Sequence, residues 1–174
     1  MFRELNTLRP FLDNPNKQYS VREIARILDI TPATASKKLK DFAKKEILKY
    51  EKSRTYDLYQ ANIDNVAFRD IKVYYSITQI RQSKLIEELN KFYLKPTIIL
   101  FGSTAAGYDT EESDIDLVVI SENKKEFPKH KEFEKKLKKN IQLFIINNLK
   151  ELRNEHLINN VLRGIVLQGE IKWM

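Results

Sequence analysis

Two short apolar runs joined by a glycine-serine turn constrain the fold more than any other feature of this chain. Residues 97–101 (Thr-Ile-Ile-Leu-Phe) and 115–120 (Ile-Asp-Leu-Val-Val-Ile) are rich in β-branched and apolar residues and have the length of strands. Gly102 and Ser103 follow the first run directly. The sequence therefore predicts two strands, with a turn at the end of the first strand.

Two acidic residues, Asp114 and Asp116, lie at the start of the second predicted strand, ten residues after the turn. Side chains two positions apart project to the same face of a strand, so both carboxylates share a face while Ile115 points into the core. Mg²⁺ is usually held by one or two carboxylates together with substrate phosphates. Gly102 permits close approach of a phosphate, and Ser103 adds a hydroxyl and backbone N–H groups at the start of a short helix. The pattern predicts a site for a nucleotide with Mg²⁺ or Mn²⁺.

The combination of the turn, the spacing and the acidic strand is much more specific than an Asp-x-Asp pair alone. Together with Ser113, it resembles the signature of the nucleotidyltransferase superfamily that includes DNA polymerase beta, in particular its minimal archaeal and bacterial members. The resemblance implies catalytic and metal-binding roles for Asp114 and Asp116. It also implies that Gly102 and Ser103 bind the nucleoside triphosphate (NTP).

The resemblance extends over residues 96–174 and implies an α/β (α+β) fold with a mixed sheet. Helical spacing of apolar residues between 128 and 139 predicts a helix, and an apolar strand is expected at 141–146. A further helix is expected at about 149–162, before the stop at Gly164, and a final short strand near 165–169. The predicted order therefore alternates strands and helices.

Two departures from the family pattern bear on activity. The position of a usual third carboxylate is occupied by Gln142, and Ala106 stands where many relatives have an arginine in the turn. An amide cannot replace the charge of a carboxylate, so its loss should weaken catalysis more than nucleotide binding. Acidic residues of the intervening loop, Asp109, Glu111 and Glu112, either are solvated or compensate in part.

The first third of the chain has a pattern typical of a helix-turn-helix. Ser20 and Glu23 form a capping box ahead of an apolar stripe with helical spacing, which predicts a short helix. Thr31 supplies an N-cap and Pro32 a first helical residue for a second helix, which runs to about residue 45. The sequence thus predicts two helices joined by a tight turn.

Two short strands are predicted next, at 47–51 and 56–60, around a basic hairpin tip. The stretch from about residue 4 to 61 resembles a winged helix-turn-helix domain, which implies binding of DNA, although such domains also serve as protein-interaction modules. The net charge of +7 and the pI of about 9.4 favour a polyanionic partner. The residues expected to reach base edges are Thr34, Ser36, Lys37 and Lys38. Those expected to contact the DNA backbone are Lys40, Lys44, Lys52 and Arg54.

Between these regions, residues 65–94 contain no glycine or proline and carry apolar residues at steps of three and four. This spacing predicts one long helix or two nearly continuous ones, which would link the domains and offer a homodimer interface. The expected organisation is a winged helix-turn-helix at 1–62, a linking helix at 63–95 and a nucleotidyltransferase-like domain at 96–174.

Composition excludes several other classes of protein. The chain has no cysteine and only two histidines, so any metal is expected to have oxygen ligands. The absence of a long apolar run and of a signal-peptide pattern predicts a cytoplasmic protein without a membrane partner. Six lysines of the later helix add basic surface that is either solvated or available to nucleic acid. They are Lys129, Lys131, Lys135, Lys136, Lys138 and Lys139.

Three functions remain open from the sequence. The first is a metal-dependent nucleotidyltransferase that moves a nucleoside monophosphate from an NTP to a hydroxyl of a protein, nucleic acid or small molecule. The second is a DNA-binding transcriptional regulator whose weakened or inactive nucleotidyltransferase-like domain binds nucleotide or a partner without turnover. The third is an antitoxin-like role, implied by the family resemblance, with a small helical toxin-like protein as the partner.

Overall fold

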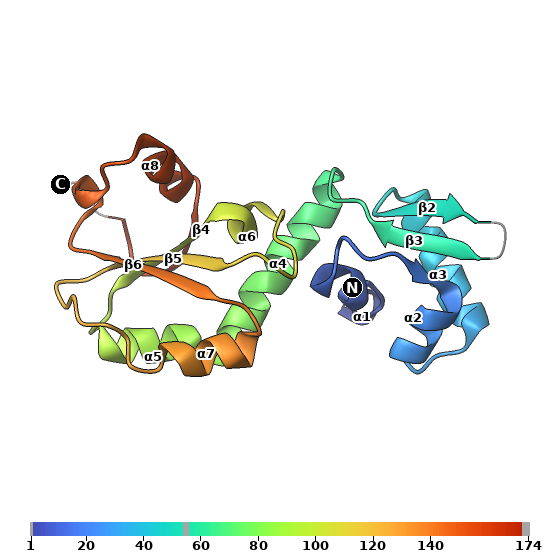
Figure 1. Cartoon of the computed structure of the whole chain (residues 1–174), viewed down its shortest axis with the longest axis horizontal. Coiled ribbons are helices and arrows are strands. Elements are labelled where there is room, and N and C mark those ends of the chain that lie inside the picture. The colour runs from blue at the N-terminus through green and yellow to red at the C-terminus, as the bar shows by residue number, and fades with distance from the viewer. Residues whose placement is uncertain (1, 54–55, 172–174) are drawn as a thin grey trace. The chain divides into compact units, whose positions relative to one another are not determined.

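The computed structural model describes residues 2–53 and 56–171, and the chain divides into two compact units (Figure 1). The first unit is Met1–Lys72 and the second is Val73–Met174, so the division falls inside helix α4 (Val66–Ser83). The domain boundaries predicted from the sequence lie near residues 62 and 95, at the two ends of the predicted linking helix. Each unit has its own sheet and is described separately below.

The first unit contains helices on a small antiparallel sheet with strand order β1-β3-β2. In chain order its elements are α1 (Phe2–Asp13), β1 (Tyr19–Ser20), α2 (Val21–Ile27), α3 (Pro32–Lys44), β2 (Leu48–Lys52) and β3 (Asp57–Ala61). Its buried side chains include Phe11, Ile24, Leu39 and Tyr59. The two helices and the hairpin confirm the predicted elements, while assignment to the winged-helix class stays a prediction.

The predicted helix starts are confirmed by their capping bonds. The Ser20 N–H donates to Glu23 Oε2 over 2.8 Å, and the Glu23 N–H donates to Ser20 Oγ over 3.3 Å, which is a complete capping box. Thr31 Oγ1 accepts from the Thr34 N–H over 3.2 Å, and Pro32 follows it at the first turn of α3. Local sequence therefore fixes where both helices begin.

Both hairpin strands begin one residue later than predicted. The Ile47 N–H donates to the Phe42 carbonyl over 3.0 Å, and Glu46 adopts a left-handed φ of 57°. These features belong to the C-terminal stop of α3. Ile47 is apolar because it is buried at this stop, not because it opens β2.

The second unit is built on a mixed sheet with strand order β6-β5-β4-β7, in which only β5 and β6 are parallel. After the end of α4, its elements are α5 (Leu85–Phe92), β4 (Thr97–Phe101), α6 (Gly102–Ala106), β5 (Ile115–Ile120), α7 (His130–Leu137), β6 (Ile141–Ile146), the 3₁₀ helix η1 (Leu149–Glu151), α8 (Glu155–Leu162) and β7 (Ile165–Gln168). This order confirms the predicted alternation of strands and helices. The bounds of β4, β5 and β6 are those predicted.

Helices cover both faces of this sheet, with α5 and α7 on one side and α8 on the other (Figure 1). Leu100 and Leu117 pack with Leu89 of α5 and Phe133 of α7. On the opposite face, which we call the α8 face, Val118 packs with Val161 and other apolar residues. Asp116 has the same strand parity as Val118 and therefore lies on the α8 face.

The linking segment follows the second of its two predicted forms, while one other predicted helix is interrupted. The linking segment consists of two nearly continuous helices, α4 and α5, which divide at Lys84, where φ is left-handed at 69°. The segment expected as one helix at 149–162 divides into η1 and α8, because the side chain of Asn154 caps a new helix by accepting from the N–H groups of His156 and Leu157. None of the helices in the described ranges has the length and apolar character needed to span a bilayer.

Candidate functional site

Strand pairing brings the predicted site residues together at one end of the sheet. Phe101, the last residue of β4, lies opposite Asp116 on β5, and Asp116 lies opposite Gln142 on β6. The turn at Gly102 follows Phe101 directly, so it reaches the same end of the sheet as the carboxylates. Long-range pairing thus creates the juxtaposition that the two-strand pattern predicted.

The carboxylate of Asp116 lies directly against the backbone of Gly102. A Cβ built on Gly102 would overlap Asp116 Oδ2, and Gly102 has a left-handed φ of 72°. Both features require glycine, since any side chain would displace the carboxylate and strain the backbone. A phosphate at this turn would therefore meet a carboxylate-bound cation on Asp116 at close range.

The short helix α6 is tied to the acidic strand through Thr104. This buried residue donates from Oγ1 to the Asp114 carbonyl over 3.2 Å. Ser103 is the second residue of α6 and is half-buried, and its carbonyl accepts from the Tyr108 N–H over 2.9 Å. Ala106 is exposed and brings no charge to the turn. Thr104 was missed in the sequence because a threonine next to a Gly-Ser turn has no pattern of its own.

Asp114 is held by two amide side chains from β6 and the residue before it. Asn140 Nδ2 donates to Oδ1 of Asp114 over 3.1 Å, and Gln142 Nε2 donates to Oδ2 over 2.6 Å. Gln142 therefore lies beside the acidic pair, as predicted from the sequence. These neutral donors orient the carboxylate but add no negative charge for a second cation.

Burial raises the pKa of the Asp116 carboxyl above its ordinary value, and the nearby negative charge of Asp114 raises it further. The ionised pair is thus disfavoured without a cation. A bound divalent cation would reverse this effect by favouring both carboxylates in their charged form.

The two carboxylates fit a cation that brings further ligands with it. Within residues 2–53 and 56–171, no cluster of three or more histidine, aspartate or glutamate side chains could hold a metal ion. Asp114 and Asp116 offer hard carboxylate oxygens, which suit Mg²⁺ or Mn²⁺ when phosphates complete the coordination. This donor set fits a cation delivered with a nucleotide better than a free cation.

The loop before Asp114 is fixed by a buried ion pair. Lys139 Nζ lies 2.5 Å from Asp109 Oδ2 and donates to the Thr110 carbonyl over 2.8 Å. Asp109 is 2% exposed, so it holds the loop and is not one of the solvated acids, whereas Glu111 and Glu112 are exposed. The sequence contained no signal for this pair, which joins residues 30 positions apart.

The basic surface of α7 is largely engaged within the second unit. Lys129 Nζ lies 2.6 Å from Glu88 Oε2, and Lys136 Nζ donates to the Ser83 carbonyl over 2.6 Å. With Lys131 on Glu134 and Lys139 on Asp109, four of the six lysines have intramolecular partners. These contacts favour the interpretation that the lysines are structural or solvated over the interpretation that they bind nucleic acid.

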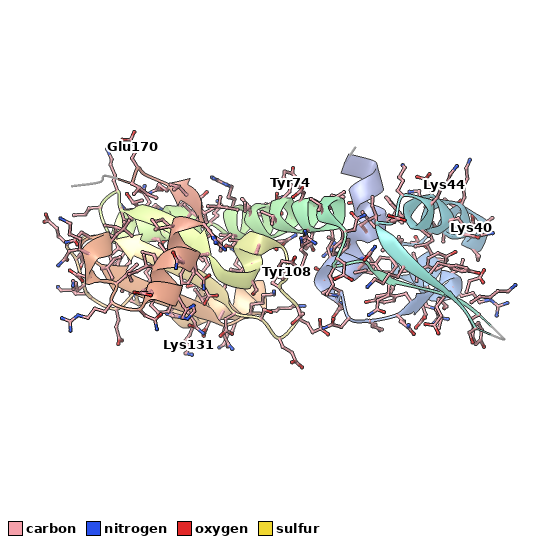
Figure 2. The ribbon with its side chains drawn as sticks, turned by 90° about the horizontal axis from the view of Figure 1, so that it is seen from above. Lys40, Lys44, Tyr74, Tyr108, Lys131 and Glu170 are labelled. Carbon is pink, nitrogen blue, oxygen red and sulfur yellow. The ribbon has the colours of Figure 1, made fainter. Side chains whose placement is uncertain are left out.

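The residues predicted to contact DNA differ in exposure. Lys37, Lys40, Lys44 and Lys52 are exposed, and Figure 2 shows Lys40 and Lys44 projecting from α3. Lys37, Lys40 and Lys44 follow steps of three and four, which places them on one face of the helix.

The other predicted DNA contacts are engaged, half-buried or outside the described part. Thr34 Oγ1 pairs with Thr31 Oγ1 over 2.9 Å, and Ser36 is half-buried. Lys38 Nζ donates to Thr7 Oγ1 over 3.1 Å and packs toward α1. Arg54 lies outside the described residues.

Comparison with known proteins gives the class of the second unit. Residues 82–166 match the family model of the nucleotidyltransferase domain. The mixed α+β architecture of the second unit is consistent with a nucleotidyltransferase-type domain over these residues. The search of curated proteins found no match.

Two solved structures are similar to parts of the chain. A candidate transcriptional regulator from Methanosarcina mazei Go1 is 22% identical, with a TM-score of 0.35, over 53% of this chain and 78% of that chain. A candidate transcriptional regulator from Rhodococcus sp. RHA1 is 16% identical, with a TM-score of 0.33, over 69% of this chain and 42% of that chain.

Proposed function

We propose that the second unit binds an NTP through a divalent cation on Asp114 and Asp116, and transfers its nucleoside monophosphate to a hydroxyl of an acceptor. The contact between Asp116 Oδ2 and Gly102 carries this proposal, because it places a carboxylate at the turn where phosphates would bind. Ser103 and the N–H groups of the turn would orient the triphosphate. The bound cation would neutralise phosphate charge and polarise the reacting phosphoryl group.

In this reaction the acceptor oxygen bonds to the α-phosphorus while the bond from that phosphorus to the bridging oxygen breaks. Pyrophosphate leaves, and the hydroxyl proton passes to solvent. The chain contributes position: Thr104 and Asn140 hold Asp114, and the Lys139–Asp109 pair holds the preceding loop. Restraint of this kind is worth most in phosphoryl transfer, where catalysis is mainly alignment and charge stabilisation.

Transfer is tested with purified protein, Mg²⁺ or Mn²⁺, and each NTP labelled at the α-phosphate. Candidate acceptors are the chain itself, duplex and single-stranded nucleic acids, and co-purifying proteins. An Asp116→Asn variant keeps the side-chain size and removes the charge, so label transferred equally by both proteins would exclude this site as the source.

A second function, regulation without turnover, is favoured by the contacts of Asp114. Both oxygens of this carboxylate accept from amides, and Gln142 stands where a third carboxylate would add charge. In this alternative the second unit binds nucleotide or a partner protein, and nucleotide occupancy regulates DNA binding. Binding of Mg²⁺ with ATP by equilibrium dialysis, combined with absent label transfer, would select it over the enzyme.

We further propose that the first unit binds duplex DNA as a winged helix. Lys37, Lys40 and Lys44 share one exposed face of α3, and Lys52 lies at the end of β2 beside the hairpin tip. Binding should weaken steeply as salt rises, because each neutralised phosphate releases counterions. Electrophoretic mobility shifts at several salt concentrations test this, and no shift at low salt would exclude it.

Two partners complete the proposal. A homodimer would present two recognition helices to two half-sites, and light scattering of the purified chain measures its mass directly. A small helical toxin-like protein is the partner in the antitoxin-like alternative. Co-expression of such a protein from a neighbouring gene, followed by co-purification, would test that alternative.

A further inference from the structure

A cavity of about 750 Å³ lies in the second unit at the opposite end of the sheet from Asp114 and Asp116. Its wall includes Thr97 at the start of β4 and Ile120 at the end of β5, which pair directly. Ile120 is four residues beyond Asp116, or about 13 Å along the strand. The cavity is therefore separate from the turn and carboxylates.

The wall of the cavity is mainly apolar and belongs to well-packed elements. Val161 of α8 is 1% exposed, and Leu152 after η1 is also buried. The apolar lining residues are Ile120, Leu149, Leu152, Ile158, Val161 and Leu162. A volume of this size is within the range of small-molecule sites, which are usually lined by apolar groups with a few polar ones.

Cationic and amide groups complete the lining. Lys95, Lys150, Asn147 and Asn148 contribute to it. Among the described residues, neither of the two lysines forms an ion pair. The lining has a single acidic residue, Glu170, against these two lysines. The charge available to a bound molecule is therefore positive.

We propose that this cavity binds a small amphipathic anion, a molecule with an apolar body and one acidic group. The apolar body packs on Ile158 and Val161, and the acidic group lies near Lys150. The site is distinct from the proposed nucleotide site on the same face of the sheet, because its lining residue Ile120 ends β5 whereas Asp116 lies near the start of that strand. A nucleoside triphosphate, which is polar and highly charged, does not match this apolar lining.

The experiment uses 8-anilinonaphthalene-1-sulfonate, an amphipathic anion whose fluorescence rises in apolar surroundings. The full chain should bind one probe molecule per chain, and ATP with Mg²⁺ should leave that binding unchanged. Ile158→Trp, which fills the cavity, should abolish the one-to-one binding. Lys150→Ala should weaken it by about two- to fivefold, the size of effect expected for an exposed ion pair, and high salt should remove that difference.

Two further variants keep the result interpretable. Leu162 is 52% exposed, so Leu162→Glu leaves the core unchanged while placing a repelling carboxylate at the cavity, and it should also reduce binding. Lys135→Ala removes an exposed lysine from α7 and should change nothing. Circular dichroism establishes that each variant is folded. Probe binding that is absent in the wild type, unaffected by Ile158→Trp and Leu162→Glu, or displaced by ATP with Mg²⁺ would overturn the proposal.

Discussion

The Gly102→Ala substitution tests the geometry of the candidate nucleotide site. The new Cβ would overlap Asp116 Oδ2, so the carboxylate must move away from the turn. A non-glycine residue at the φ of 72° also costs about 1–2 kcal/mol of folding stability. Misplacement of a site group by about 1 Å can reduce function roughly 100-fold, so we expect affinity for ATP with Mg²⁺ to fall by about 10- to 100-fold.

Isothermal titration calorimetry measures that affinity, and urea unfolding measures the change in folding free energy. Gly107→Ala is the matched control, since Gly107 has a similar φ of 74° at the other end of α6. The control should lose comparable stability but retain most of its nucleotide affinity. If Gly102→Ala binds nucleotide as tightly as the wild type, the proposed proximity of phosphate and carboxylate is wrong.

Three other predictions concern catalysis, DNA binding and pH. Gln142→Asp should increase label transfer from NTP by restoring a third carboxylate, and transfer unchanged by it would contradict a role for that charge. Lys40→Ala should reduce the slope of log affinity for DNA against log salt by about 1, measured by fluorescence anisotropy, whereas Lys135→Ala should not. Affinity for ATP with Mg²⁺ should fall as pH drops through the raised pKa of Asp116, since a metal ligand must be deprotonated. Calorimetry of the wild type across pH measures this dependence, and an affinity that stays constant through that range would contradict it.

The same raised pKa has a consequence for stability. Because the folded state holds the proton of Asp116 more tightly than the unfolded state, ionisation of this group destabilises the fold without a cation. The stabilisation that comes from the protonated Asp116 is fully present below the ordinary pKa of aspartate. It is lost as the pH rises through the raised pKa of this group. Asp116→Asn should flatten this part of the stability profile in urea unfolding.

The central strands could be predicted from sequence because their composition is locally decisive. β4, β5 and β6 are continuous apolar runs with clear ends, and their predicted bounds match the structure. The start of β2 lies one residue later than predicted because Ile47, an apolar residue next to β2, takes part in the stop of α3. Composition at that point does not distinguish a strand residue from a buried cap.

The candidate site was predictable only in part. The spacing of Asp114 and Asp116 predicted that both side chains lie on one face of a strand. The family resemblance predicted that Gln142 lies beside them. The bond from Asn140 to Asp114 and the Lys139–Asp109 pair depend on strand pairing and loop closure between distant residues, which no local pattern encodes. Similarly, helical spacing predicted that Lys38 is exposed, but its long side chain reaches Thr7 and donates a hydrogen bond to it.

Nucleotide binding by the wild type and Asp116→Asn, measured with and without Mg²⁺, tests the central proposal most directly. We predict one ATP per wild-type chain, bound only when Mg²⁺ is present, and loss of that binding in the folded Asp116→Asn variant. Binding that is independent of Mg²⁺, equal in both proteins, or absent in the wild type would contradict the two-carboxylate site.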